Sequence, residues 1–203
     1  MSSTSAIRKS SVSTCRRAGF WPAYAPAADT DSRGPEDSTL NTSQPVRIEP
    51  ATERDVPELL RLIKALAEYE RLGDHVVATE DQLRESLFGH APSAEAVLAV
   101  ADGAAVGFAL WFHSFSTFLG KRGLYLEDLF VLPDWRGRGV GRALLQHLAQ
   151  IAVARGCGRM EWSVLNWNEP AIRFYRSLGA RPMDEWTVYR LTGKTLREVA
   201  SRQ

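Results

Sequence analysis

The stretch LFVLPDWRGRGVGR, Leu129 to Arg142, joins an apolar run typical of a strand to a helix through three glycines at alternate positions, 137, 139 and 141. Glycine lets the backbone approach a ligand closely. The first amides of a helix lack an internal partner, so they point at an anion that the helix dipole also favours. Arg136, Arg138 and Arg142 add positive charge, and a guanidinium can bind a phosphate with two hydrogen bonds. The stretch therefore predicts a phosphate-binding loop.

The spacing of this loop separates three classes of phosphate site. A Walker loop needs G-x-x-x-x-G-K-[ST], and no Gly-Lys-Ser/Thr follows the strand. A dinucleotide fingerprint needs a glycine where Arg142 stands. The pattern that remains is [RQ]-x-x-G-x-[GA], from Arg136 to Gly141. It resembles the pyrophosphate loop of the GNAT acetyltransferases, which bind acetyl-CoA.

A second motif lies about thirty residues downstream, where WNEPA (167–171) leads into FYRSLGA (174–180). It resembles the second signature of the same superfamily, N-x-x-A-x-x-x-Y-x-x-x-G-[FA]. In that signature the asparagine opens a helix beside the pantetheine arm, and the tyrosine faces the coenzyme sulfur. The two signatures together favour a CoA thioester as the ligand of the loop.

Composition limits the remaining possibilities. A chain of 203 residues with 44 % hydrophobic content favours one sizeable core. The net charge of +1, from 25 basic and 24 acidic residues, gives no reason to expect nucleic acid or an acidic membrane as a partner. No apolar run approaches the roughly twenty residues of a membrane span. Two cysteines are too few for a disulfide framework, which favours a cytoplasmic protein.

Residues 1–44 differ from the rest, because they are rich in Ser, Thr, Pro and Ala and show no apolar periodicity. We expect this segment to be a disordered tail, followed by an N-acetyltransferase domain at 45–203. The first 28 residues carry four basic side chains and no acid, as transit peptides do. A nonfunctional extension or a misassigned start is the favoured alternative.

Hydrophobic spacing predicts the other elements. A capping box at Thr52 and Asp55 opens a helix to about Glu70, and a second box at Thr79 and Gln82 opens a shorter helix. The remaining expected elements are strands at 46–48, 96–101, 104–113, 124–131, 159–165 and 187–191, and helices after the glycine loop and at 168–179. This order predicts an α/β fold, a GNAT-like three-layer sandwich with a mixed, mostly antiparallel sheet flanked by helices.

Further stretches resemble one branch of the superfamily. RLIKALAEYE (61–70), YLEDLFV (125–131), WNEP (167–170) and the late Trp186 are similar to the spermidine/spermine-type diamine acetyltransferases and their relatives that acetylate thialysine and similar basic amino acids. The resemblance covers residues 46–197. It implies acetyl-CoA as co-substrate, a small cationic amine as acceptor and a homodimer.

The same resemblance implies roles for individual residues. The residues expected at the coenzyme are Leu129, Phe130, Val131, Arg136, Gly137, Arg138, Gly139, Val140, Gly141, Arg142, Asn168, Glu169, Pro170 and Ala171. The residues expected at the amine are Tyr69, Glu70, Glu127, Trp167, Asp184 and Trp186. Carboxylates attract a cationic amine, and tryptophan faces add cation–π attraction.

The expected chemistry uses two side chains. An alkyl amine is protonated at pH 7, so a base must remove its proton, and Glu127 is the candidate, with substrate steering alone as the alternative role. Tyr175 is the expected general acid for the leaving thiolate. A backbone amide freed where the YLEDLFV strand deforms would stabilise the oxyanion. Cys157 has no base nearby in the sequence, which favours a structural role, and no metal is expected.

The acceptor depends on the segment from Ser114 to Gly123. The polyamine enzymes have an acid and a tryptophan where this chain has Ser116 and Phe118, and Lys121 and Arg122 add positive charge. These departures favour a short diamine or an amino acid over a long polycation. A protein N-acetyltransferase and a non-catalytic acyl-CoA-binding module are the alternative functions.

Overall fold

The computed structural model describes residues 45–202, so the expected tail at 1–44 lies outside the described part of the chain. Five strands form one sheet: β1 (Arg47–Pro50), β2 (Glu95–Ala101), β3 (Ala104–Ser116), β4 (Lys121–Val131) and β5 (Met160–Trp162). The helices are α1 (Val56–Tyr69), α2 (Glu80–Phe88), α3 (Val140–Ala154), α4 (Glu169–Ser177) and α5 (Gly193–Ser201). Short 3₁₀ turns span Glu53–Asp55, Gly73–His75 and Pro133–Trp135.

The sheet is mixed and mostly antiparallel. Its strand order is β1-β2-β3-β4-β5, and all neighbours are antiparallel except β4 and β5. The tight turn at Asp102 and Gly103 joins β2 to β3, and both residues have positive φ, as a two-residue hairpin turn of the favoured hand requires.

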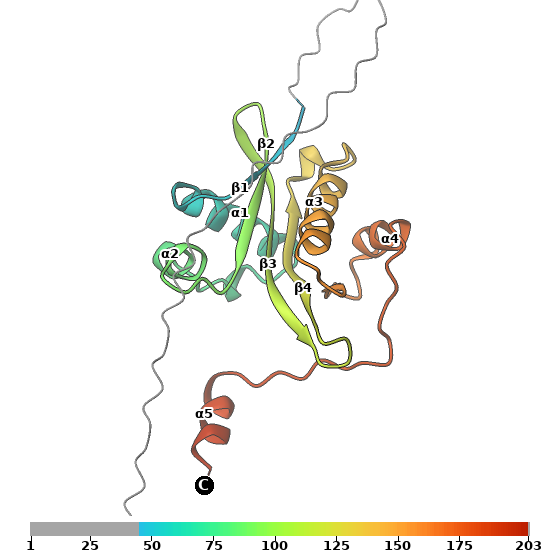
Figure 1. The fold of residues 1–203 in the computed structure, drawn as a ribbon. Coiled ribbons are helices and arrows are strands. Elements are labelled where there is room, and N and C mark those ends of the chain that lie inside the picture. Colours follow the sequence, from blue (N-terminus) through green and yellow to red (C-terminus); the bar gives the residue numbers. More distant parts are fainter. Residues whose placement is uncertain (1–44, 203) are drawn as a thin grey trace, which may run out of the picture. The chain divides into compact units, whose positions relative to one another are not determined.

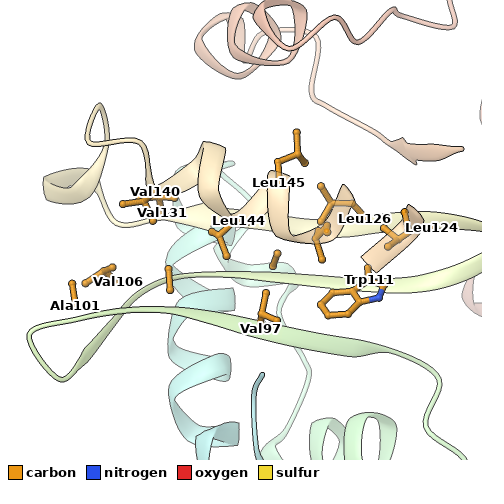
Figure 2. Close-up of a cluster of buried hydrophobic side chains, with 14 residues drawn as sticks. Val97, Ala101, Val106, Trp111, Leu124, Leu126, Val131, Val140, Leu144 and Leu145 are labelled. Atoms are coloured by element: carbon orange, nitrogen blue, oxygen red, sulfur yellow. The ribbon is translucent and has the colours of Figure 1, made fainter. Parts of the chain in front are cut away.

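Each face of the sheet is covered by helices, so the predicted three-layer sandwich is confirmed (Figure 1). On one face, Val97, Leu124 and Leu126 of the strands pack with Leu144 of α3 (Figure 2). Leu148 of α3 belongs to the same cluster. On the other face, the sheet side chains pack against α1 and α2, and the buried residues of that cluster are Leu59, Leu62, Leu66, Leu87, Ala96, Leu98, Ala105, Phe108 and Phe130.

Local signals in the sequence fix most boundaries. The capping box of Thr52 and Asp55 forms, with Asp55 Oδ2 accepting from Thr52 N at 2.7 Å, and the box of Thr79 and Gln82 opens α2. Gly156 follows α3 with a φ of 67°, the left-handed conformation that ends a helix. The predicted strands up to residue 131 are present with ends shifted by a few residues.

Of the two last predicted strands, one is present but shorter than predicted and the prediction of the other is wrong. The strand expected at 159–165 is limited to Met160–Trp162, because its pairing with β4 ends where β4 changes register. No strand forms at 187–191, because a strand needs a neighbour for its backbone groups. Hydrogen bonds of residues 181–202 within the described structure stay inside that segment, and all of these residues are exposed. We refer to residues 181–202 as the C-terminal arm.

Candidate active site

The glycine loop has the geometry of an anion site. Gly137 and Gly139 have φ values of 74° and 83°, and a Cβ atom on either would meet no atom within 4 Å. Gly139 is the N-cap of α3, and the first helical bond of this turn runs from Ala143 N to Gly139 O. The preceding amides are therefore free to bind an anion. These residues fit a pyrophosphate, since backbone donors line open space.

The three arginines of the loop point to different partners. Arg136 donates from Nε to Val131 O at 3.0 Å, and its guanidinium lies 4.3 Å from the ring centre of Tyr69. Arg138 lies 5.0 Å over the ring of Trp135, and Arg142 is exposed. Arg136 thus connects the loop to α1, and Arg138 and Arg142 are exposed.

Asn168 joins the end of α1 to the start of α4. Its buried Oδ1 accepts from Ala171 N at 3.3 Å, which caps α4, and from the hydroxyl of Tyr69 at 3.1 Å. Pro170 occupies the first turn, where its missing amide costs nothing. Glu169 points outward and lies 3.9 Å from Arg173. The structure therefore brings the predicted coenzyme residue Asn168 together with the predicted amine residue Tyr69.

Tyr175 lies on α4, and its ring packs against β5. Its ring centre is 5.0 Å from that of Trp162, and the ring of Phe174 is 5.3 Å away. Burial, and then the negative charge of Glu70, raise the pKa of Tyr175 to about 12. The hydroxyl therefore keeps its proton at neutral pH, which is the state that a general acid needs.

β4 carries a bulge at Glu127. Leu110 faces Asp128 and Trp111 faces Leu126, so Glu127 is the extra residue of the strand. The expected deformation of the YLEDLFV strand is therefore present. Glu127 is exposed at this bulge.

Asp128 is a carboxylate that the sequence analysis missed. It is half-buried, and burial, followed by the charges of Glu127 and Glu70, raises its pKa to about 6. Burial also raises the pKa of Glu70. A signal for this residue exists in the sequence. The buried positions Leu124 and Leu126 lie two apart, yet the next on that face are Leu129 and Val131, so the alternation slips by one residue at Glu127.

The six predicted amine residues lie in three places. Tyr69 and Trp167 have ring centres 5.9 Å apart, and Glu70 follows Tyr69 in the chain. Glu127 lies at the bulge of β4. Asp184 and Trp186 lie on the exposed C-terminal arm, where 71 % of the Trp186 surface is accessible. The structure therefore brings Tyr69 and Trp167 into contact and leaves Asp184 and Trp186 apart from them.

Cys157 has a histidine neighbour that the sequence does not reveal, with His113 Nδ1 at 3.9 Å from Sγ. The ring faces Gly123 O at 3.1 Å through Nδ1, and a carbonyl only accepts, so Nδ1 carries the proton. Arg155 donates to the remaining nitrogen, Nε2, at 2.9 Å. Both ring nitrogens are engaged, so His113 is not a free base for the thiol.

Residues 45–202 contain no group of three or more His, Cys, Asp or Glu side chains placed to hold a metal ion. None of the helices in this range has both the length and the apolar character needed to cross a membrane.

The profile of the acetyltransferase (GNAT) family matches residues 59–180, more than half of the chain. The chain belongs to the GNAT acetyltransferase family. This GNAT protein is therefore an acyltransferase, as both sequence signatures predicted.

Comparison with known proteins places the GNAT protein beside the predicted branch. It is 38 % identical over 168 residues to the thialysine N-epsilon-acetyltransferase of Bos taurus, covering 77 % of this chain and 98 % of the relative. It is 31 % identical to the L-ornithine N5-acetyltransferase of Arabidopsis thaliana, covering 81 % and 95 %. An integron cassette protein of V. cholerae has a TM-score of 0.67 and 30 % identity, covering 77 % and 98 %.

Proposed function

We propose that this protein transfers an acetyl group from acetyl-CoA to a primary amine of a small basic molecule. The observation that carries this proposal is the 3.1 Å hydrogen bond from the hydroxyl of Tyr69 to Asn168 Oδ1, which joins the expected amine side of the site to the expected coenzyme side. The charge of Glu70, the residue after Tyr69, contributes to the raised pKa values of Asp128 and Tyr175, which supports an acidic group near a protonated hydroxyl. The relatives described as acting on thialysine and L-ornithine support a basic amine as acceptor.

The coenzyme site is proposed to follow the glycine loop and the end of β4. Amides of residues 137–142 would bind the pyrophosphate, with Arg138 and Arg142 adding positive charge. Backbone groups of Leu129, Phe130 and Val131 would meet the pantetheine arm, beside the segment Asn168–Ala171. When bound, acetyl-CoA supplies the activated acyl group.

The proton of the amine is proposed to leave through the acidic group of β4. Glu127 is the base expected from the sequence, and its exposed position suits capture of the cationic amine. Asp128 is a second candidate, because a carboxylate with a pKa near 6 is ionised at pH 7 and is a stronger base than an ordinary aspartate. The bulge at Glu127 leaves a ladder position unpaired, which supports a backbone donor for the oxyanion.

Tyr175 is proposed as the general acid for the departing thiolate. Its raised pKa keeps the phenol protonated, and Phe174 next to it lies 3.8 Å from the position that a Cβ of Gly141 would occupy. Helix α4, which carries Tyr175, is thus packed against the start of α3, the helix that begins at the phosphate loop.

The homodimer implied by the sequence resemblance is also part of the proposal. Met183, Trp186, Val188, Tyr189 and Leu191 expose between 51 and 92 % of their surface on the C-terminal arm. Several large apolar side chains exposed along one segment are typical of an interaction surface. Pairing of the arm with a second copy would cover it and would bring Asp184 and Trp186 near an amine site.

The proposed function is tested by following CoA release with acetyl-CoA and a panel of diamines, polyamines, basic amino acids and peptide N-termini. We expect more CoA to be released with small basic amines than with peptides. Release with peptides alone would favour a protein N-acetyltransferase. Binding of acetyl-CoA without release by any amine would favour a non-catalytic acyl-CoA-binding module.

A further inference from the structure

We propose that Arg71 binds the carboxylate of the acceptor, which makes the preferred acceptor a basic amino acid rather than a diamine. This inference rests on the proposed function and narrows its substrate class. Arg71 directly follows Tyr69 and Glu70 at the end of α1. None of the sequence patterns singled it out, since a lone exposed arginine after a helix has no motif.

The backbone of Arg71 has an unusual conformation. Its φ is 63°, one of two positive values among non-glycine residues in the described part of the chain. Bulky side chains are rare in this region because the Cβ crowds the backbone. The bonds from Arg71 N to Glu68 O at 3.1 Å and from Leu72 N to Ala67 O at 2.7 Å hold the turn in place. Glycine would fit this turn more easily, yet an arginine occupies it.

The side chain of Arg71 is directed to the amine residues. Its guanidinium lies 5.2 Å from the ring centre of Trp167, which in turn contacts Tyr69. Among residues 45–202, Arg71 forms no ion pair with any carboxylate. The guanidinium donors therefore remain available, whereas the guanidinium of Arg136, 4.3 Å from the ring centre of Tyr69, donates from Nε to Val131 O.

The proposed acceptor site has charges of both signs. Glu70 follows Tyr69 in the chain, and its charge and that of Glu127 raise the pKa of Asp128, so these three acids would bind the ammonium to be acetylated. Arg71, over the ring of Trp167, would bind the carboxylate, because a guanidinium binds a carboxylate with two hydrogen bonds. A diamine has two cationic ends and would place one of them against Arg71. An amino acid with a basic side chain has a carboxylate for Arg71 and an ammonium for the acids.

The test compares matched pairs of acceptors that differ only in the carboxylate. L-Ornithine is paired with 1,4-diaminobutane, and L-lysine with 1,5-diaminopentane. The readout is the ratio of kcat/KM for the amino acid to kcat/KM for its diamine. The wild-type ratio should be well above 1, and Arg71→Met should lower it about 10- to 100-fold, as expected for a lost charge-assisted interaction.

Three further variants separate charge from backbone effects. Arg71→Lys keeps the charge and should recover part of the ratio. Arg71→Gly relieves the positive φ but removes the charge, so it should lower the ratio as Arg71→Met does. Arg54→Met, a change of an exposed arginine in the turn before α1, should leave the ratio and the activity as in the wild type.

The outcomes distinguish this inference from the proposed function. Two results would overturn the role of Arg71 and leave the proposed function standing. One is equal acetylation of diamines and amino acids by the wild type, and the other is a kcat/KM ratio that Arg71→Met leaves unchanged. Absence of acetylation of every amine would overturn the proposed function. In that case, calorimetry can still measure the dissociation constant of L-ornithine for the wild type and for Arg71→Met. Equal dissociation constants would reject the binding of a carboxylate by Arg71.

Discussion

The hydroxyl of Tyr69 donates a 3.1 Å hydrogen bond to Asn168 Oδ1, across 99 positions of sequence. The same oxygen caps α4 through Ala171 N. The bond therefore joins the helix that carries the amine residues to the helix that carries Tyr175. A change at either end should alter both the stability of α4 and the alignment of the two substrates.

Asn168→Ala removes the cap of α4 and leaves the hydroxyl of Tyr69 without its partner. We expect it to lower the free energy of unfolding by about 1–2 kcal/mol. Tyr69→Phe removes only one of the two bonds, so it should cost about 1 kcal/mol. Urea denaturation of both single variants and the double variant measures the coupling. Strictly additive losses would show that the Tyr69–Asn168 bond contributes nothing to stability.

Asp128 makes the stability of the folded protein depend on pH, and its raised pKa sets the direction of this dependence. The folded state holds this proton up to about pH 6, whereas the ordinary value is 3.8. Its stabilising contribution is therefore complete below about pH 4 and is lost as the pH rises through 6. Asp128→Asn should be more stable than the wild type at pH 7.5, by at most about 3 kcal/mol, with a smaller difference at pH 4. Denaturation at both pH values measures this.

The same variant decides which carboxylate is the base. If Asp128 takes the proton, kcat/KM of the wild type falls below about pH 6, and Asp128→Asn loses most activity together with that acidic limb. Glu127→Gln is the comparison on the adjacent residue. It should raise KM for the amine and keep the limb at a lower pH, because the charge of Glu127 helps to raise the pKa of Asp128. A limb that disappears in Glu127→Gln and persists in Asp128→Asn would assign the base to Glu127.

The parts of the fold that follow from short-range patterns were predictable. The capping boxes at Thr52 and Thr79 and the glycine after α3 each specify a boundary through their own backbone bonds. The strand at 187–191 was predicted wrongly, because its apolar residues match a strand but pairing depends on a distant partner. Alternation of apolar and polar residues identifies a segment that could form a strand. The strand forms only if a sheet edge with unpaired backbone groups lies close enough to pair with it.

In the candidate site too, features set by local sequence were predictable and those that depend on distant segments were not. Both signature motifs lie at helix starts, where local sequence sets the backbone, and the structure forms α3 and α4 there. Asp128 was missed because its burial depends on the bulge opposite Leu110 and Trp111 of another strand. The contact between Arg71 and Trp167 joins residues almost a hundred positions apart, which spacing within one segment does not encode.

The positive φ values of Gly137 and Gly139 predict that alanine is poorly tolerated at both positions. Each substitution forces an L residue into the left-handed region, at a cost of about 1–2 kcal/mol. We expect KM for acetyl-CoA to rise about tenfold in Gly137→Ala and Gly139→Ala. Gly141→Ala is the matched control, since its φ is not positive and its new Cβ would meet Phe174 at an ordinary 3.8 Å. Equal effects at all three positions would contradict this explanation.

Tyr175→Phe should lower kcat on the order of 10²-fold and change KM for acetyl-CoA little, because the ring stays packed against Trp162 while the proton donor is lost. With a pKa of about 12, the phenol should cause no loss of activity up to pH 10. Steady-state kinetics of both proteins between pH 6 and 10 measures these effects. An unchanged kcat would remove Tyr175 from the role of general acid.

Removal of the C-terminal arm should separate folding from assembly. Its residues make hydrogen bonds and ion pairs only with one another in the described structure, so a chain ending at Ala180 should unfold at nearly the same temperature. If the arm joins two copies, light scattering should show a dimer for the full chain and a monomer for the shortened one. The shortened chain should bind acetyl-CoA but acetylate amines poorly, because Asp184 and Trp186 are gone.

Mixing two inactive variants tests whether the arm of one copy serves the site of the other. Tyr175→Phe and the double variant Asp184→Ala, Trp186→Ala should each be weakly active alone. Activity regained on mixing them would show that the arm of one copy serves the site of the other, and no recovery between chains that exchange would restrict the arm to its own site.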